Sequence, residues 1–139
     1  MPGISFFLDD IRFSLPKRSG LRNWLKNMII SEGKKPGKIG IILTSDKGLL
    51  KLNVEFLKHD YYTDIMTFQD VSDDISGEIY ISVDRVRENA KKLDKEFFDE
   101  LHRVMAHGIL HMLGYSDKKD SEKKVMRAKE DFYLNLRQF

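Results

Sequence analysis

The sequence predicts an α+β fold in a single domain over residues 1–139, with a small mixed β-sheet packed with helices. Short apolar runs typical of strands occur up to residue 83, and the 3.6-residue period of helices takes over from Asp84. The chain has 139 residues, of which 41% are hydrophobic, and this suffices for one core without disulfide bonds. No repeat or low-complexity linker divides it.

The chain begins with an expected strand, an amphipathic helix and a second strand. Residues 4–8 form a short apolar run. A helical spacing that ends near Gly33 follows, and its apolar positions are Leu21, Trp24, Leu25, Met28 and Ile29. After a turn over residues 34–37, the apolar residues 38–44 are expected to form a buried strand.

The middle of the chain is expected to add a short helix and two further strands. The helix covers residues 46–57. Residues 65–68 and 78–83 are β-rich runs, and the polar residues 69–76 join them as a loop.

Helices are expected to fill the rest of the chain. Val86, Ala90 and Leu93 mark the first. The second carries two histidines beside the apolar positions Phe97, Leu101, Val104, Met105 and Gly108. The last helix, capped by Asp120 or Ser121, is expected to return to the core through Val125, Ala128, Phe132 and Leu136.

Composition excludes several kinds of site. The chain has no cysteine, so disulfide bonds, thiolate metal sites and a cysteine nucleophile are ruled out. No run of 18 apolar residues and no leader-like N-terminus occur, so we expect no membrane association and a cytoplasmic location. Basic and acidic residues, 24 and 22, nearly balance, so a polyanion would have to bind at a local basic patch.

A candidate metal site lies in residues 107–117. His107 and His111 are one helical turn apart, so both imidazoles can reach the same cation. Gly114 allows the helix to stop and the chain to reverse, which can return Asp117 toward the same point. Three protein ligands with open positions are typical of catalytic zinc. The alternative is a pair of partly buried structural histidines and a solvated aspartate.

This segment, His-Gly-x-Leu-His-x-x-Gly-Tyr, resembles the YbeY-type single-strand-specific endoribonucleases, the bacterial ribosomal RNA maturation factors. Thr-Asp-Ile-Met-Thr-Phe at residues 63–68 and Gly-Glu-Ile at residues 77–79 share the resemblance, which extends from about residue 52 to 133. It implies an α+β fold, a zinc site, and a role in maturing the 3′ end of small-subunit ribosomal RNA and in ribosome quality control. The implied partners are single-stranded ribosomal RNA and the ribosome or ribosomal proteins. By resemblance, His107 and His111 are the first two ligands.

Two positions depart from the family pattern. The third ligand position, usually histidine, is Asp117, and an arginine present in many relatives is replaced by Leu57. A carboxylate is an ordinary zinc ligand, and the resulting set also suits Fe²⁺, Mn²⁺ or Ni²⁺, so Zn²⁺ is expected with these as alternatives. Loss of the arginine removes a bidentate phosphate contact, for which Lys58 or His59 can substitute.

The expected chemistry is hydrolysis of an RNA phosphodiester by a metal-bound water. No general base is evident from the sequence. Asp64 and Glu78 lie within the family-like segments and are candidates, although exposed or structural carboxylates are the alternative interpretation of both.

Candidate substrate contacts are basic and aromatic. Lys118 and Lys119 begin a basic cluster that includes Lys123, Lys124 and Arg127; its alternative interpretation is a solvated helical face. Bases could stack on aromatic side chains if these were exposed, and the candidates are Tyr61, Tyr62 and Phe68.

Two other functions remain open at this point. A metalloprotease or another metal-dependent hydrolase is one, but Gly108 occupies the position where zinc peptidases place a catalytic glutamate. The other is a ribosome assembly factor whose metal site is mainly structural, which Leu57 and Asp117 keep open. No feature of the sequence sets the oligomeric state.

Overall fold

Strands and helices follow one another much as the sequence predicts. The computed structural model describes residues 3–59 and 62–139. Its elements, in chain order, are β1 (Gly3–Leu8), α1 (Arg18–Ser31), β2 (Pro36–Thr44), α2 (Asp46–Leu57), β3 (Ile65–Gln69), β4 (Ile75–Ser82), α3 (Val83–Leu93), α4 (Phe97–Met112) and α5 (Asp120–Leu134).

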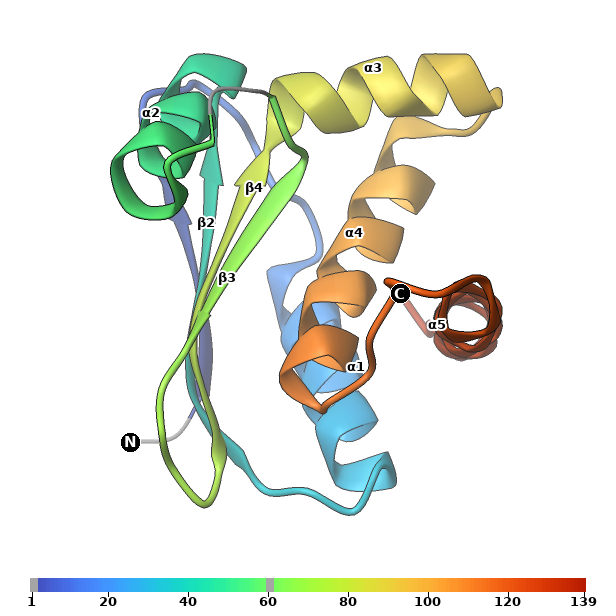
Figure 1. The fold of residues 1–139 in the computed structure, drawn as a ribbon. Helices are drawn as coiled ribbons and strands as arrows, with labels where there is room; N and C mark the ends of the chain where they lie inside the picture. Colours follow the sequence, from blue (N-terminus) through green and yellow to red (C-terminus); the bar gives the residue numbers. More distant parts are fainter. Residues whose placement is uncertain (1–2, 60–61) are drawn as a thin grey trace.

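The strands form one mixed sheet in the order β1-β2-β4-β3, which confirms the predicted α+β class. β1 and β4 both run parallel to β2, whereas β3 runs antiparallel to β4 and forms an edge of the sheet. In Figure 1, α1 and α4 cover one face of the sheet, α2 lies against the other, and α5 packs on the outer side of α4. α4 is therefore held between the sheet and α5.

The main core lies between the sheet and α4. Isoleucines that alternate along β2 and β4 supply the sheet side, and Leu101, Met105 and Ile109 supply the helix side. At Gly108 the two layers come close together. A Cβ there would lie 2.9 Å from Ile65 Cδ1 and 3.1 Å from two atoms of Ile79, so glycine allows α4 to approach β3 and β4 closely.

Two strand boundaries differ from the prediction. β2 begins at Pro36, inside the predicted turn, and β4 covers Ile75–Ser82 where residues 78–83 were expected. The backbone N–H of Ile75 donates to the carbonyl of Lys35 at 2.8 Å, and this contact extends the pairing of the two strands past a bulge. The predicted loop over residues 69–76 is therefore shorter than expected.

The predicted buried face of the last helix was wrong by one residue. Val125 and Phe132 are 49% and 54% exposed, and the buried positions are Met126, Glu130 and Tyr133. Polar contacts select this face, because the Tyr133 carbonyl accepts a hydrogen bond from Trp24 Nε1 at 2.7 Å and Glu130 binds side chains of α4.

Leu93, one of the apolar positions predicted for α3, is half exposed.

The predicted caps of α5 were also wrong. The capping position is Lys119, one residue before Asp120. The Glu122 carboxylate accepts a hydrogen bond from the Lys119 backbone N–H at 2.8 Å, so the cap is supplied from within the first turn.

Among residues 3–59 and 62–139, no helix is both long and apolar enough to cross a membrane.

Candidate metal centre

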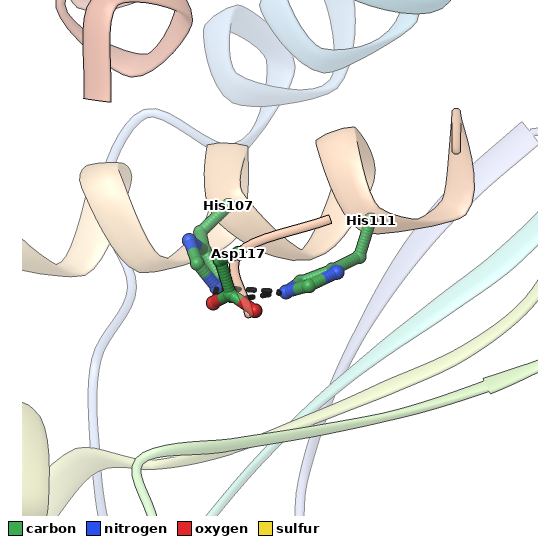
Figure 2. A group of neighbouring side chains, drawn as sticks. All are labelled: His107, His111 and Asp117. Carbon is green, nitrogen blue, oxygen red and sulfur yellow. Dashed lines mark hydrogen bonds and ion pairs between the residues drawn. The ribbon is translucent and has the colours of Figure 1, made fainter. Parts of the chain in front are cut away.

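Three predicted ligands converge at the C-terminal end of α4. His107 Nε2 lies 3.0 Å from His111 Nε2, and Asp117 Oδ2 lies 3.3 and 3.4 Å from these two nitrogens (Figure 2). Gly114, with a φ of 102°, ends the helical path and turns the chain back, as predicted. The three side chains are partly exposed. Their donor atoms, Nε2 of His107, Nε2 of His111 and Oδ2 of Asp117, form a compact triangle at the edge of the helix layer, the ligand triangle.

The spacing of these donors fits one metal ion. All three lie within 4.8 Å of one another. Two ligands at about 2.0–2.1 Å from a tetrahedral zinc ion are about 3.3 Å apart, close to the three distances in the triangle. Two imidazole nitrogens and one carboxylate oxygen are also a chemically suitable set, because they bind zinc and other divalent first-row metals.

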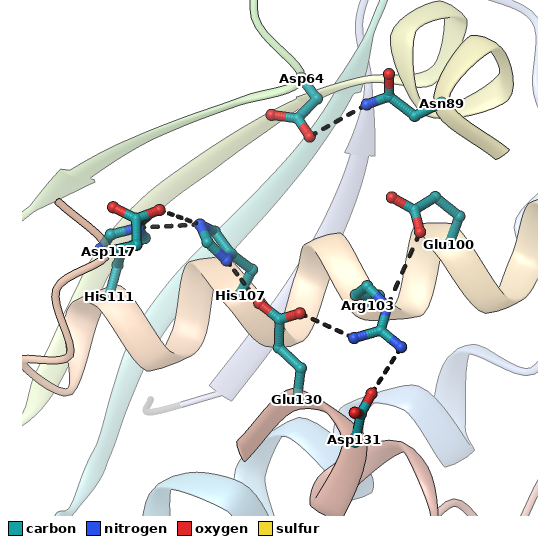
Figure 3. Close-up of polar contacts among 9 residues, drawn as sticks. All are labelled: Asp64, Asn89, Glu100, Arg103, His107, His111, Asp117, Glu130 and Asp131. Carbon is teal, nitrogen blue, oxygen red and sulfur yellow. Dashed lines mark hydrogen bonds and ion pairs between the residues drawn. The ribbon is translucent and has the colours of Figure 1, made fainter. Parts of the chain in front are cut away.

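His107 is oriented by a carboxylate on the neighbouring helix. Its Nδ1 lies 2.7 Å from Glu130 Oε2, and Glu130 Oε1 accepts a hydrogen bond from Arg103 at 3.0 Å (Figure 3). Arg103 also pairs with Asp131 at 2.8 Å. With Glu130 ionised, Nδ1 of His107 carries the proton and donates it, which leaves the Nε2 lone pair directed at the triangle.

The pKa values of His107 and Asp64 are both raised, but for different reasons. Burial alone would lower the pKa of His107, but the hydrogen bond and charge of Glu130, with Asp117 and Asp64, raise it above its ordinary value. Burial raises the pKa of Asp64, and the positive charge of His107 only partly offsets this. A metal ion that binds His107 therefore has to displace a proton held more firmly than usual.

The loop that carries Asp117 is anchored to α1. Tyr115 Oη donates a hydrogen bond to Glu32 Oε1 at 2.5 Å. Tyr133 also donates to Glu32, and Lys129 pairs with it at 3.1 Å. These partners outweigh the effect of burial and lower the pKa of Glu32. The ionised Glu32 thus links α1, the loop and α5 beside the ligand triangle.

A cavity of about 260 Å³ opens beside the triangle, between α4 and α5. His107 and Asp117 line one part of it. Its other polar lining residues are Asp64, Glu100, Arg103, Lys123, Arg127 and Glu130. The structure therefore brings Asp64, from the segment before β3, and two members of the predicted basic cluster next to the ligands.

Other candidate residues lie outside this cavity. Glu78 is exposed on β4, and alternation along the strand directs it to the sheet face opposite Ile79, which packs against α4. Lys58 and His59 are exposed at the end of α2. Lys118 and Lys119 are exposed in the loop just after Asp117.

The candidate stacking residues do not gather at the ligands. Tyr61 lies outside the described residues. Tyr62 is exposed, with the Arg85 guanidinium 5.1 Å from its ring centre. The Phe68 ring packs edge-on against Phe56 and Tyr80, both at 5.7 Å, so it belongs to an aromatic cluster beside α2.

Sequence reasoning missed Glu130, Arg103 and Glu100. A signal for two of them was present, because Glu100 and Arg103 precede His107 by seven and four residues and so share its helix face. Glu130 was missed because the buried face of α5 was assigned one residue away. On the correct face it is a buried acidic residue between Met126 and Tyr133.

Comparisons with known proteins agree over nearly the whole chain. A family model described as endoribonuclease YbeY matches residues 11–138. The endoribonuclease YbeY of Cytophaga hutchinsonii is 47% identical over 138 residues, covering 98% of this chain and 96% of the relative. That of Flavobacterium johnsoniae is 47% identical over 123 residues, 88% of each chain. The solution structure of a Thermotoga maritima protein has a TM-score of 0.69 at 30% identity and covers 95% of this chain and 87% of that one.

Proposed function

This chain belongs to the YbeY endoribonuclease family, and on that premise we propose that it hydrolyses phosphodiester bonds in single-stranded ribosomal RNA. The proposed role is maturation of the 3′ end of small-subunit ribosomal RNA and ribosome quality control in the cytoplasm. The ribosome or ribosomal proteins are the proposed partners. The observation that carries the proposal is the convergence of His107, His111 and Asp117, 3.0–3.4 Å apart, beside a cavity with cationic residues.

We propose that these three residues hold Zn²⁺, with Fe²⁺, Mn²⁺ and Ni²⁺ as alternatives. When bound, such an ion supplies a Lewis acid and a water molecule of lowered pKa. Glu130 supports the site by holding the proton of His107 on Nδ1, so that Nε2 stays available as a ligand.

Asp64 is the proposed proton acceptor. It lines the cavity with His107 and Asp117, and its raised pKa brings the carboxylate closer to the range in which it can accept a proton from attacking water. Glu78 faces away from the cavity and is the weaker candidate. Gly108, packed against Ile65 and Ile79, provides no carboxylate of the kind that peptidases use.

Cations near the cavity are the proposed phosphate contacts. Lys123 and Arg127 are one helical turn apart on α5 and both line the cavity, so their charges attract the phosphates that flank the cleaved bond. Lys118 and Lys119 extend this basic surface from the adjacent loop. Lys58 and His59, at the end of α2, are proposed contacts for more distant nucleotides.

The test combines metal analysis with RNA cleavage. We expect the purified protein to bind about one equivalent of metal and to cleave a single-stranded oligoribonucleotide from the 3′ end of small-subunit ribosomal RNA, but not its duplex. His111→Ala is expected to lose both properties, because one of three ligands is removed. Asp120→Asn, at an exposed position outside the ligand triangle, is the control and is expected to retain both.

Stoichiometric metal with no metal-dependent cleavage, in protein that remains folded by circular dichroism, would contradict the nuclease proposal. That outcome would favour an assembly factor whose metal is structural.

A further inference from the structure

The cavity beside the metal ligands contains a buried acidic residue that the proposed reaction does not use. Glu100, on α4, is only 6% exposed. Its Oε1 accepts no hydrogen bond from any residue that the structure describes. The nearest cationic atom is Arg103 Nε, 3.9 Å away, which is too far for a hydrogen bond. A buried carboxyl oxygen without a hydrogen-bond partner lowers the stability of the fold. A hydrogen bond from a bound ligand would remove this penalty and gives a physical reason for a glutamate at this position.

Arg103 does not satisfy Glu100 because its guanidinium is engaged elsewhere. Its two terminal nitrogens donate to Glu130 and Asp131 at 3.0 and 2.8 Å. In Figure 3 the Glu100 carboxylate lies on the side of Arg103 away from these two acids. Oε1 of Glu100 is thus buried without a hydrogen-bond partner, on a residue that lines the cavity.

Asp64 adds to the same cavity a second carboxylate whose hydrogen-bonding capacity is only partly filled. Its described side-chain hydrogen bond, from Asn89 Nδ2, is long at 3.5 Å. Lys123 and Arg127 line the cavity from α5, and neither forms an ion pair within the described parts of the chain. The cavity therefore combines hydrogen-bond acceptors with free cations on its α5 side.

We propose that this cavity is a nucleoside subsite, in which Glu100 accepts a hydrogen bond from the amino group of a base while Lys123 and Arg127 bind the attached phosphate. This inference rests on the proposed ribonuclease function and adds a base preference to it. At about 260 Å³ the cavity has room for one nucleoside. An ionised carboxylate only accepts hydrogen bonds, so it selects bases with an amino donor, as in the pairing of Glu or Asp with cytosine N4.

Cytosine and uracil form the sharpest comparison, because they differ little in size. Cytosine presents an amino group on its Watson–Crick edge. Uracil presents one N–H between two carbonyl oxygens, and these repel the second oxygen of a carboxylate. A subsite built on Glu100 therefore prefers cytidine to uridine.

Calorimetric titration of the zinc-loaded protein with CMP and with UMP tests the proposal. The phosphate contacts are the same for both nucleotides, so the ratio of the two dissociation constants reports on the base alone. We expect CMP to bind about tenfold more tightly than UMP, the effect of one hydrogen bond to a charged group. Lys123→Ala is expected to weaken both nucleotides by a similar factor.

The key variant is Glu100→Met, which keeps the length of the side chain but removes its acceptors. We expect its CMP-to-UMP ratio to fall to within about twofold of unity. Glu96→Met is the matched control at the N-cap of the same helix, because Glu96 is exposed and its side chain makes no capping hydrogen bond. Replacing an unpaired buried carboxyl with an apolar group is also expected to leave the melting temperature unchanged or raised.

Equal affinity of wild-type protein for CMP and UMP would overturn the inference, and this measurement needs no variant to fold. Retention of the preference in Glu100→Met would overturn it as well. Cleavage of RNA without a base preference would contradict only the proposed subsite and leave the proposed nuclease function standing. A base preference without any cleavage would instead contradict only the proposed nuclease function.

Discussion

The carboxylate of Asp117 sets the charge of the ligand triangle. With two neutral imidazoles, it leaves a bound divalent ion at a net charge of +1, whereas a third imidazole would leave +2. A lower net charge weakens the attraction for a phosphate oxygen and the acidification of bound water. Under the proposed function, the positive charges of Lys123 and Arg127 in the adjacent cavity would offset part of this loss.

Removing the charge of Asp117 is expected to weaken metal binding. Asp117→Asn keeps the size of the side chain but replaces an anionic ligand with a neutral amide, so we expect the zinc dissociation constant to rise more than about tenfold. Asp117→His, which replaces the carboxylate with another common zinc ligand, is expected to retain binding. Competition with a chromophoric chelator measures both, with Asp120→Asn as the control. Unchanged affinity in Asp117→Asn would show that Asp117 is not a ligand.

At the scale of elements, the pairing of α4 with α5 prepares the site. α4 supplies the two histidines, but the orientation of His107 depends on Glu130 of α5, whose carboxylate is shared between His107 and Arg103. The same contact helps to select the buried face of α5. Packing of this helix and orientation of the proposed ligand His107 therefore rest on the same buried side chain.

Glu130→Gln tests this coupling. A neutral amide is a weaker partner for the Nδ1 proton of His107, so zinc affinity is expected to fall by about 10- to 100-fold, the usual effect of losing such a partner. Asp131→Asn is the matched control, since Asp131 also pairs with Arg103 but is exposed and makes no described contact with His107. The two affinities are measured by chelator competition. Similar losses in both variants would argue that Arg103 pairing, and not the contact with His107, controls affinity.

At the scale of the whole molecule, His102 ties the helices to the C-terminal segment. It is buried on α4, within 6.0 Å of the Trp24 ring and 5.3 Å of the Phe139 ring, and its Nδ1 accepts a hydrogen bond from Arg137 at 2.8 Å. Burial, followed by the charge of Arg137, lowers the pKa of His102 to about 4, although Asp99 opposes the shift. The folded protein thus holds this imidazole neutral well below its ordinary pKa.

This shift predicts acid sensitivity of the fold. The unfolded chain binds a proton at His102 below about pH 6.5, whereas the folded chain does so only near pH 4, so stability is full above pH 6.5 and falls as the pH drops toward 4. The loss is on the order of 3 kcal/mol. His102→Gln, which does not titrate, is expected to show a smaller decrease in unfolding free energy between pH 7 and 4.5 in urea titrations. Equal decreases in both proteins would contradict the assignment to His102.

Much of the fold followed from local patterns. The apolar spacing of α1 predicted its five buried residues, because a long amphipathic helix has one clear apolar face. α5 shows the limit of this reasoning. Val125 and Phe132 on one face and Met126 and Tyr133 on the other are all apolar at helical spacing, so hydrophobicity alone did not select the face. Contacts of Glu130 and of the Tyr133 carbonyl, with residues far away in the sequence, selected it.

The sequence by itself determined the residues of the ligand triangle, because two histidines four positions apart share a helix face and a glycine beyond them allows the chain to return. Only the tertiary structure decided which groups surround that triangle. Glu130, Asp64 and Glu100 come from α5, from the segment before β3 and from an earlier turn of α4, and packing brings them to the triangle or its cavity. Helical period is a local property that the sequence carries directly. The burial and pairing of a carboxylate are set by elements far away along the chain, so they appear only once the helices and the sheet have packed together.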